Sequence, residues 1–171
     1  MLAKTLFGGR ETPLNVFATL ARHPLLLRRV NALGGAFLAY GTLDAREREL
    51  LILRVAARVR SRYELAQHVV IGRRVAVSDE EIDALLGDLG AYAWSPDDLA
   101  LLRFTDDLLE RDVVSDEAWD AVAGRLDTQQ LLELLFMVGF YRMLAGYLRS
   151  VGVELESELE LPPAASGPDW R

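Results

Sequence analysis

The sequence of 171 residues contains no cysteine. This absence excludes disulfides, thiolate catalysis, iron–sulfur clusters and cysteine-based zinc sites. The single lysine, Lys4, lies near the start of the chain, so we expect neither a Schiff-base lysine nor the lysine of a phosphate-binding loop. Imidazole groups are limited to His23 and His68. Any chemistry must therefore use carboxylates, one or two histidines, hydroxyl groups and arginines.

Positive charge is also scarce. The 19 Lys and Arg residues are outnumbered by 26 Asp and Glu residues, which gives a formal net charge of −7. Four of these acids, between Glu154 and Glu160, lie in one short stretch, so the rest of the chain is nearer −3. Nucleic-acid binding needs clustered positive charge, and we therefore expect no nucleic-acid partner.

Long hydrophobic runs are absent although hydrophobic residues make up 51% of the chain. The most apolar run, Leu134 to Tyr141, is far shorter than the roughly 20 residues that span a bilayer. The first ten residues have no sustained apolar core and do not resemble a secretory signal. We therefore expect a soluble, cytoplasmic protein with a full hydrophobic core and no membrane partner.

Helical periodicity dominates from Pro13 onward, and strand-like alternation is rare. This pattern predicts a single all-α domain, a compact helical bundle over residues 13–153, preceded by a loose N-terminal arm over residues 1–12. The acidic, then Pro/Ala/Ser/Gly-rich residues 154–171 are expected to form a mobile tail. Helices are predicted over 14–21, 24–40 and 44–59, and capping signals predict further helix starts at Ser61, Ser78, Ser95 and Asp127.

Glu49 departs from the amphipathic pattern of the helix predicted over residues 44–59. At about 100° per residue, Glu49 lies roughly 180° from Arg58, among apolar positions such as Ile52. A carboxylate on an apolar face must be paired or protonated, and such a group can serve as a general acid or base. The alternative is a first-turn glutamate stabilised by the helix dipole and by Arg46, three residues earlier.

Glu64 and His68 lie one turn apart on a mainly apolar face of the next helix. A carboxylate beside an imidazole can fix the tautomer of a catalytic histidine. The alternative is structural, because Ser61 and Glu64 have the spacing of a capping box, which would leave His68 as a core histidine. Glu49, Glu64 and His68 have no dedicated metal-ligand spacing, so we expect no metal.

Residues 46–74, RERELLILRVAARVRSRYELAQHVVIGRR, resemble the carboxymuconolactone decarboxylase family, which also contains the alkyl hydroperoxidase D-like proteins. In the redox members of that family, a glutamate precedes a Cys-x-x-Cys-x-x-x-His motif at the start of a helix. Glu49 matches the upstream glutamate, Ser61 and Glu64 match the two cysteines, and His68 matches the motif histidine.

The decarboxylase-like members are similar in lacking the redox pair, and they often carry an E-Y-E-W-x-x-H-like string. This chain has Tyr63 and Glu64 in such a string, but Leu65 replaces the tryptophan. The resemblance is strongest over residues 24–85 and continues more weakly through the helical remainder. It implies an all-α fold of the alkyl hydroperoxidase D-like type.

The resemblance also implies a lyase or isomerase that needs no cofactor and is not a thiol peroxidase. Its acid/base chemistry would be a decarboxylation, lactone isomerisation or related rearrangement of a small carbonyl or carboxylate compound. His68 would be the main acid/base, Glu64 its orienting partner or a second acid, and Glu49 a donor to a developing enolate oxygen. Ser61 and Tyr63 are assigned to substrate binding.

A second hypothesis is a catalytically silent helical oligomer that binds a hydrophobic ligand or a protein partner. Apolar positions run nearly all round the helices at 50–59 and 131–148, more than the inner face of one small bundle requires. We therefore expect a homo-oligomer, and the resemblance implies a trimer or a hexamer. Arg54, Arg58 and Arg60 are expected on a solvated or intersubunit face, and the arginine-rich composition suits a high-GC bacterial source.

Overall fold

The structure is a computed structural model that describes residues 12–170. Nearly all of the predicted N-terminal arm therefore lies outside the described residues. Within this range the chain is helical and has no strand, as the periodicity predicts. The elements are α2 (Asn15–Leu20), α3 (Pro24–Leu38), α4 (Ala45–Val59), α5 (Arg62–Arg74), α6 (Asp79–Leu86), η1 (Leu89–Ala91), α7 (Pro96–Arg111), α8 (Asp116–Ala123), α9 (Thr128–Val151) and η2 (Pro163–Ala165).

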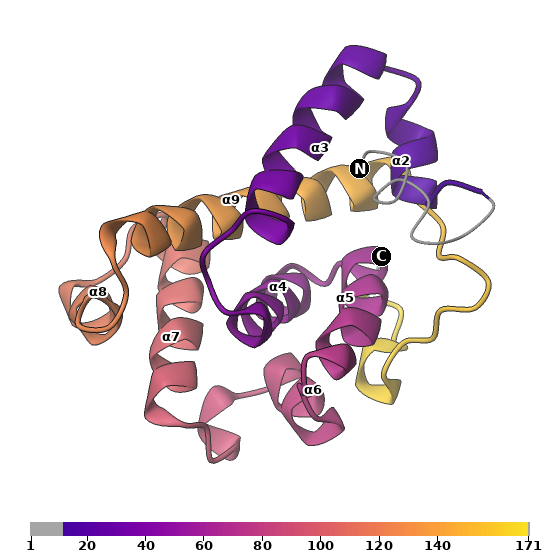
Figure 1. The fold of residues 1–171 in the computed structure, drawn as a ribbon. Coiled ribbons are helices and arrows are strands. Elements are labelled where there is room, and N and C mark those ends of the chain that lie inside the picture. The colour runs from indigo at the N-terminus through magenta and orange to yellow at the C-terminus, as the bar shows by residue number, and fades with distance from the viewer. Residues whose placement is uncertain (1–11, 171) are drawn as a thin grey trace.

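Helix α4 occupies the centre of the bundle and is seen nearly end-on in Figure 1. It contacts α5, α6, α7 and α9, so other helices surround it. Every residue from Glu49 to Ala57 is buried. This helix accordingly lacks the single apolar stripe of a surface helix and carries inward-facing groups all round its circumference.

Local capping signals place most helix starts correctly. The Asp44 carboxylate accepts a hydrogen bond from the Arg46 backbone N–H at 2.8 Å, at the start of α4. Complete capping boxes begin α6, at Ser78, and α9, at Asp127. These caps satisfy backbone N–H groups that have no partner within the helix itself, and they depend on residues close in the sequence.

The short helix α8 is not among the predicted helices. It buries Ala118 and Val122, an apolar stripe too brief for periodicity to identify. The Ser115 hydroxyl accepts a hydrogen bond from the Ala118 N–H, and Asp107 of α7 accepts one from the Ser115 N–H at 3.0 Å. Contact with α7, rather than intrinsic propensity, therefore stabilises this two-turn segment.

Arg54 projects from α4 into the interior, and its side chain is only 4% exposed. Its guanidinium donates to both carboxylate oxygens of Asp106 on α7, at 2.8 and 2.6 Å. It also donates to the carbonyl oxygens of Leu85 and Gly87 at the end of α6, at 2.8 and 2.9 Å. The expectation that Arg54 lies on a solvated or intersubunit face is thus wrong, because this residue ties three elements together.

The acidic tail follows the surface of the domain and is held at Glu156, which is 5% exposed. The Glu156 carboxylate accepts hydrogen bonds from the Tyr63 hydroxyl at 2.7 Å, from the Asn15 backbone N–H at 2.8 Å and from the Gln67 amide at 2.7 Å. Composition predicted a mobile tail, and its mobility stays a prediction. The structure packs one of its acids against α2 and α5.

The end of the tail has two further attachments. Ala165 in η2 is fully buried, and η2 contacts α6. Asp169 forms an ion pair of 3.1 Å with Arg60, at the turn between α4 and α5. Arg60 therefore holds the tail of its own chain rather than facing solvent alone, and Arg58 pairs with Glu110 of α7.

Helix α9 combines core contacts with an exposed apolar face. Within the described residues it is the one helix long and apolar enough to cross a bilayer by length and composition, but it contacts α3, α4, α5 and α7, as a core helix does. Leu132, Phe136 and Met143 remain exposed. A shallow apolar groove of about 350 Å³ lies between this face and Leu33 of α3.

The Arg54–Asp106 pair generates a stability prediction. Asp106→Ala should lower the free energy of unfolding by about 3 kcal/mol, because Arg54 would remain buried without its counter-charge. The matched control is Glu110→Ala, one turn further along α7, which removes a half-exposed partner of Arg58 and should cost less than about 1 kcal/mol. Urea unfolding of both variants measures the difference, and equal costs would contradict a special role for Arg54.

Candidate active site

Glu49 and His68 meet between α4 and α5. The Glu49 carboxylate lies 2.7 Å from His68 Nδ1, and the two residues are only 2% and 7% exposed. The central position of α4 buries Glu49, and α5 packs beside α4 so that His68 faces it. The sequence offered Glu64 as the orienting partner of His68 or as a second acid; the first role is wrong, because Glu49 makes this contact across helices, and the second stays a prediction.

The alternative interpretation, in which Arg46 pairs with Glu49, is also wrong. Arg46 does not pair with Glu49 but reaches away to bind Asp98 of α7 at 2.9 Å and Glu81 of α6. Glu49 thus depends on an imidazole rather than on a guanidinium for its partner. These two carboxylates hold the Arg46 side chain at the first turn of α4, where it is 28% exposed.

The Glu49 contact determines which nitrogen of His68 can exchange protons with another molecule. A carboxylate that accepts this hydrogen bond pairs with a protonated Nδ1 and leaves Nε2, for which the described residues provide no hydrogen-bond partner, as the nitrogen available to another molecule. The His68 side chain keeps 9% of its surface exposed. Glu49 therefore orients the ring, as the third group of a catalytic constellation does.

Glu64 is buried without a partner. Both of its carboxylate oxygens lack hydrogen bonds in the described structure, and the residue is 2% exposed. This burial raises the pKa of Glu64 well above the ordinary glutamate value. Burial thus favours the protonated form of Glu64, which can donate a hydrogen bond.

The predicted capping box at the start of α5 does not form. Ser61 is the N-cap residue of α5, but its side chain makes no capping hydrogen bond, and its hydroxyl is buried without a partner. Glu64 does not reach back to the N-cap either. By the resemblance described above, these two positions are the ones that carry the cysteine pair of the redox family members. Here they hold two buried, unsatisfied oxygen groups, an uncommon and costly arrangement.

Tyr141 of α9 completes the cluster and was not among the candidates drawn from the sequence. Its ring stands edge-on to His68 with 5.2 Å between centroids. Burial, together with the nearby Glu49 and Glu64 carboxyl groups, raises the pKa of Tyr141 well above its usual value, so its hydroxyl stays protonated. Tyr141 ends the apolar run of α9, and no spacing rule relates it to a histidine 73 positions earlier.

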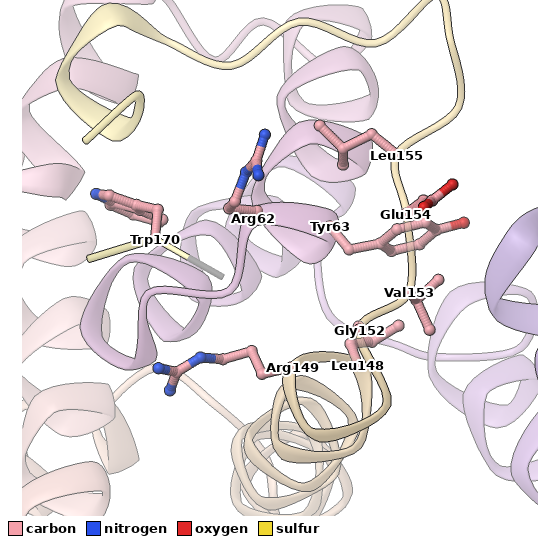
Figure 2. Close-up of a pocket in the computed structure, with 9 residues that line it drawn as sticks. All are labelled: Arg62, Tyr63, Leu148, Arg149, Gly152, Val153, Glu154, Leu155 and Trp170. Atoms are coloured by element: carbon pink, nitrogen blue, oxygen red, sulfur yellow. The ribbon is translucent and has the colours of Figure 1, made fainter. Parts of the chain in front are cut away.

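Tyr63 lies outside this cluster. Its hydroxyl donates to Glu156 and accepts from the Val16 N–H at 3.2 Å, and burial, followed by Glu156, raises its pKa. Its ring instead lines a separate surface pocket (Figure 2). Ser61 lies at the start of the same helix, and the substrate-binding roles of Ser61 and Tyr63 remain predictions. Among the described residues, no group of three or more His, Asp or Glu side chains is arranged to hold a metal ion.

Comparison with known proteins identifies a family match that covers part of this cluster. Residues 24–107 match the family model described as "Carboxymuconolactone decarboxylase family". No protein among the curated sequences matches the chain. The matched segment contains Glu49, Ser61, Glu64 and His68 but ends before Tyr141.

Several solved structures share the fold. A protein of unknown function from Agrobacterium tumefaciens, described as a candidate antioxidant defence protein AhpD, is 16% identical, with a TM-score of 0.74 over 82% of this chain and 97% of that one. A peroxidase-related protein from Ralstonia eutropha JMP134, described as an alkylhydroperoxidase AhpD core, is 20% identical, with a TM-score of 0.77 over 86% and 79%. The debrominase Bmp8, in complex with 2,3,4-tribromopyrrole, is 14% identical, with a TM-score of 0.71 over 91% and 82%.

The raised pKa of Glu64 makes stability depend on pH with a definite sign. In the unfolded chain Glu64 ionises above about pH 4.5, whereas the folded protein keeps it protonated to higher pH. Between these two pKa values the folded state binds the extra proton, so stability falls as pH rises. Glu64→Gln removes this titration and preserves the shape of the side chain.

The stability advantage of Glu64→Gln over wild type should therefore grow as the pH is raised from about 4 to 8. Chemical unfolding at several pH values measures it. Glu110→Gln is the control, since it makes the same substitution at an exposed acid of α7 instead of a buried one. A constant difference between Glu64→Gln and wild type across this range would contradict a neutral, buried Glu64.

Proposed function

Because residues 24–107 belong to the carboxymuconolactone decarboxylase family, we propose that this protein is an acid/base enzyme of that type without the thiol chemistry of its redox relatives. The buried Glu49–His68 hydrogen bond carries the proposal, and the buried, unpartnered carboxyl group of Glu64 one turn earlier on α5 supports it. Together they provide an oriented imidazole and a separate proton donor in one cluster, the two components that general acid–base catalysis needs.

The substrate is a small compound with a lactone group or with a carboxylate β to a carbonyl, and the reaction is a decarboxylation, lactone isomerisation or related rearrangement. In a decarboxylation, the bond to the carboxylate carbon breaks, carbon dioxide leaves, and the electron pair passes into an enolate. The Glu64 O–H donates a hydrogen bond to the enolate oxygen. Protonated His68 delivers a proton from Nε2 to the carbon, and Glu49 stabilises the imidazolium before that transfer.

This assignment gives Glu49 the orienting role that the sequence suggested for Glu64 and keeps Glu64 in its alternative role as a second acid. Glu49 is the orienting partner because it holds Nδ1 of His68. Glu64 is the donor to the oxygen because burial raises its pKa and so favours the protonated form. Tyr141, whose hydroxyl also keeps its proton, is a second group able to donate to a developing negative charge.

The exposed apolar face of α9 supports a homo-oligomer as part of the proposal. Phe136 and Met143 are more than half exposed, and the groove beside them is the kind of surface that monomers usually cover. A trimer or hexamer in the cytoplasm remains our proposal. The same surface also supports the second candidate function, a helical oligomer without catalytic activity, in which Glu49, Glu64 and His68 serve only as buried polar groups.

Substitution of His68 separates these two functions. With carboxymuconolactone and a panel of small β-keto acids as test substrates, His68→Ala should reduce turnover by roughly 10²–10⁴, the usual scale of general acid–base catalysis. Carbon dioxide release and deuterium incorporation at the protonated carbon measure the reaction. His23→Ser is the matched control, because it changes the other histidine, an exposed N-cap of α3, to another capping residue.

Loss of turnover counts as catalytic only where the protein remains folded. Thermal unfolding is therefore measured on the same samples, together with Glu49→Gln, which keeps the size of the partner and removes its charge. If His68→Ala and Glu49→Gln both turn over substrate at the wild-type rate, the acid/base proposal is wrong. Absence of turnover by wild type across the whole panel would favour the non-catalytic oligomer.

Peroxide reduction should be absent. In thiol peroxidases a cysteine is oxidised to a sulfenic acid and then resolved as a disulfide, and this chain has no cysteine. Purified, metal-free protein should therefore consume no more hydrogen peroxide than a heat-killed sample, with or without a dithiol reductant. A cysteine-containing relative of the same fold serves as the positive control. Sustained catalytic consumption by this protein would contradict the proposed division between redox and acid/base members.

A further inference from the structure

Helix α9 carries a stripe of exposed, uncharged residues along one face. The residues of this α9 stripe are Leu132, Phe136, Gly139, Met143 and Gly146. They follow one another at intervals of four, three, four and three residues, the spacing of a helix–helix seam. At about 100° per residue they fall within about 80° of one another, and Tyr141 of the candidate active site lies roughly 180° from their centre.

The large members of the stripe protrude from the surface. Leu132, Phe136 and Met143 are 53%, 64% and 55% exposed. The buried residues of α9 lie on its opposite face, where the helix packs against the rest of the domain. An apolar row of this length on the outer face of a helix is typical of a surface that another chain covers.

The two glycines of the stripe are not required by the packing of a single chain. A Cβ atom added at Gly139 or Gly146 would meet nothing within 4 Å, and both residues have ordinary helical backbone conformations. Glycine inside a helix is less favourable than alanine. Close approach by a second helix gives both glycines a role, because it needs a face without side chains.

Gly139 lies in the shallow groove of about 350 Å³. Leu33 of α3 and Leu108 of α7 line this groove together with Phe136 and Met143 of α9. In Figure 1, α3 and α7 meet α9 from different sides. The groove is therefore an apolar recess beside the protruding Phe136, so that a recess and a projection lie next to each other on one face.

The charges along α9 favour an antiparallel partner. Asp127 and Glu133 lie at the start of the helix, whereas the exposed Arg142 and Arg149 lie in its second half. A parallel copy would bring like charges and like ends of the helix dipoles together. An antiparallel copy places the acidic start of each α9 beside the basic half of the other.

We propose that the α9 stripe packs antiparallel against the α9 stripe of a second copy of this chain, about a two-fold axis at Gly139. Phe136 then lies between Gly139 and Gly146 of the second copy, and Leu132 lies level with the second copy's Gly146. The two-fold axis returns each of these contacts, so both copies fill and are filled. The contact makes a dimer, or the dimer unit of a hexamer, and not a trimer.

The occupant is a second copy because the face is complementary to itself. It supplies both the large side chains and the glycine recesses, and it carries opposite charges in its two halves. The inference rests on the homo-oligomer part of the proposed function and gives it a definite contact. It is independent of the acid/base chemistry, because Tyr141 points away from the stripe.

Sedimentation velocity of the full chain tests the association. Wild type should be a dimer or a hexamer, with a dissociation constant for the two-fold contact below about 10 µM. Gly139→Leu fills the recess and should weaken this contact by at least about tenfold, leaving a monomer or, from a hexamer, a trimer. Gly35→Leu is the matched control, because a Cβ at Gly35 of α3 also meets nothing within 4 Å.

A single cysteine tests the position of the axis. The chain has no cysteine of its own, so Gly139→Cys can form a disulfide only with the same residue of another copy. The two backbones should be close enough there for this bond. Oxidation of Gly139→Cys should give a covalent dimer on a non-reducing gel. Gly35→Cys should give none, because Gly35 lies about 160° round α3 from Leu33.

The outcomes are distinct. A dimer or hexamer that is weakened by Gly139→Leu, retained by Gly35→Leu and trapped by Gly139→Cys supports the proposal. A wild-type monomer or trimer overturns it. Undiminished association in Gly139→Leu also overturns it, because the oligomer would then use another surface. If Gly139→Leu fails to fold in thermal unfolding, the cysteine pair decides: absence of a covalent dimer from Gly139→Cys overturns the proposal.

Discussion

Helix α4 lies at the centre of the bundle, and each polar side chain that it turns inward must find a partner on another helix. Burying a charged group without a partner would cost several kcal/mol, so these contacts constrain how the surrounding helices pack. Arg54 is satisfied by Asp106 and by two backbone carbonyls at the end of α6. Glu49, on another face of the same helix, is satisfied by His68. The first contact fixes the scaffold, and the second creates the candidate site.

At the start of α5, by contrast, buried polar groups lack partners. Ser61 and Glu64 are buried there without hydrogen-bond partners, although a capping box would have satisfied both at no cost in packing. Buried, unpaired polar groups reduce stability, and these two lie on the helix that carries His68, whereas others occur at Arg48, Trp94 and Arg125. The position of Tyr141 against the same imidazole extends the cluster onto a third helix.

A single acidic residue, Glu156, attaches the tail to the helical domain. Glu156 is drawn into the interface of α2 and α5 by three donors, one of them the Tyr63 hydroxyl. Tyr63 is thereby separated in function from its neighbour Glu64, because adjacent residues of a helix point about 100° apart. One faces the tail and the pocket of Figure 2, and the other faces the interior.

The sequence by itself determined the helical class, most helix starts and the unusual burial of Glu49 and His68. These features follow from interactions between residues close in the chain, such as the Asp44 cap, or from periodicity along one helix. It could not show that His68 binds Glu49 rather than Glu64, that Arg54 is buried, that α8 forms, or that Glu156 anchors the tail. Those outcomes depend on which helices become neighbours, and only tertiary packing decides that, because it brings together partners between 19 and 141 positions apart.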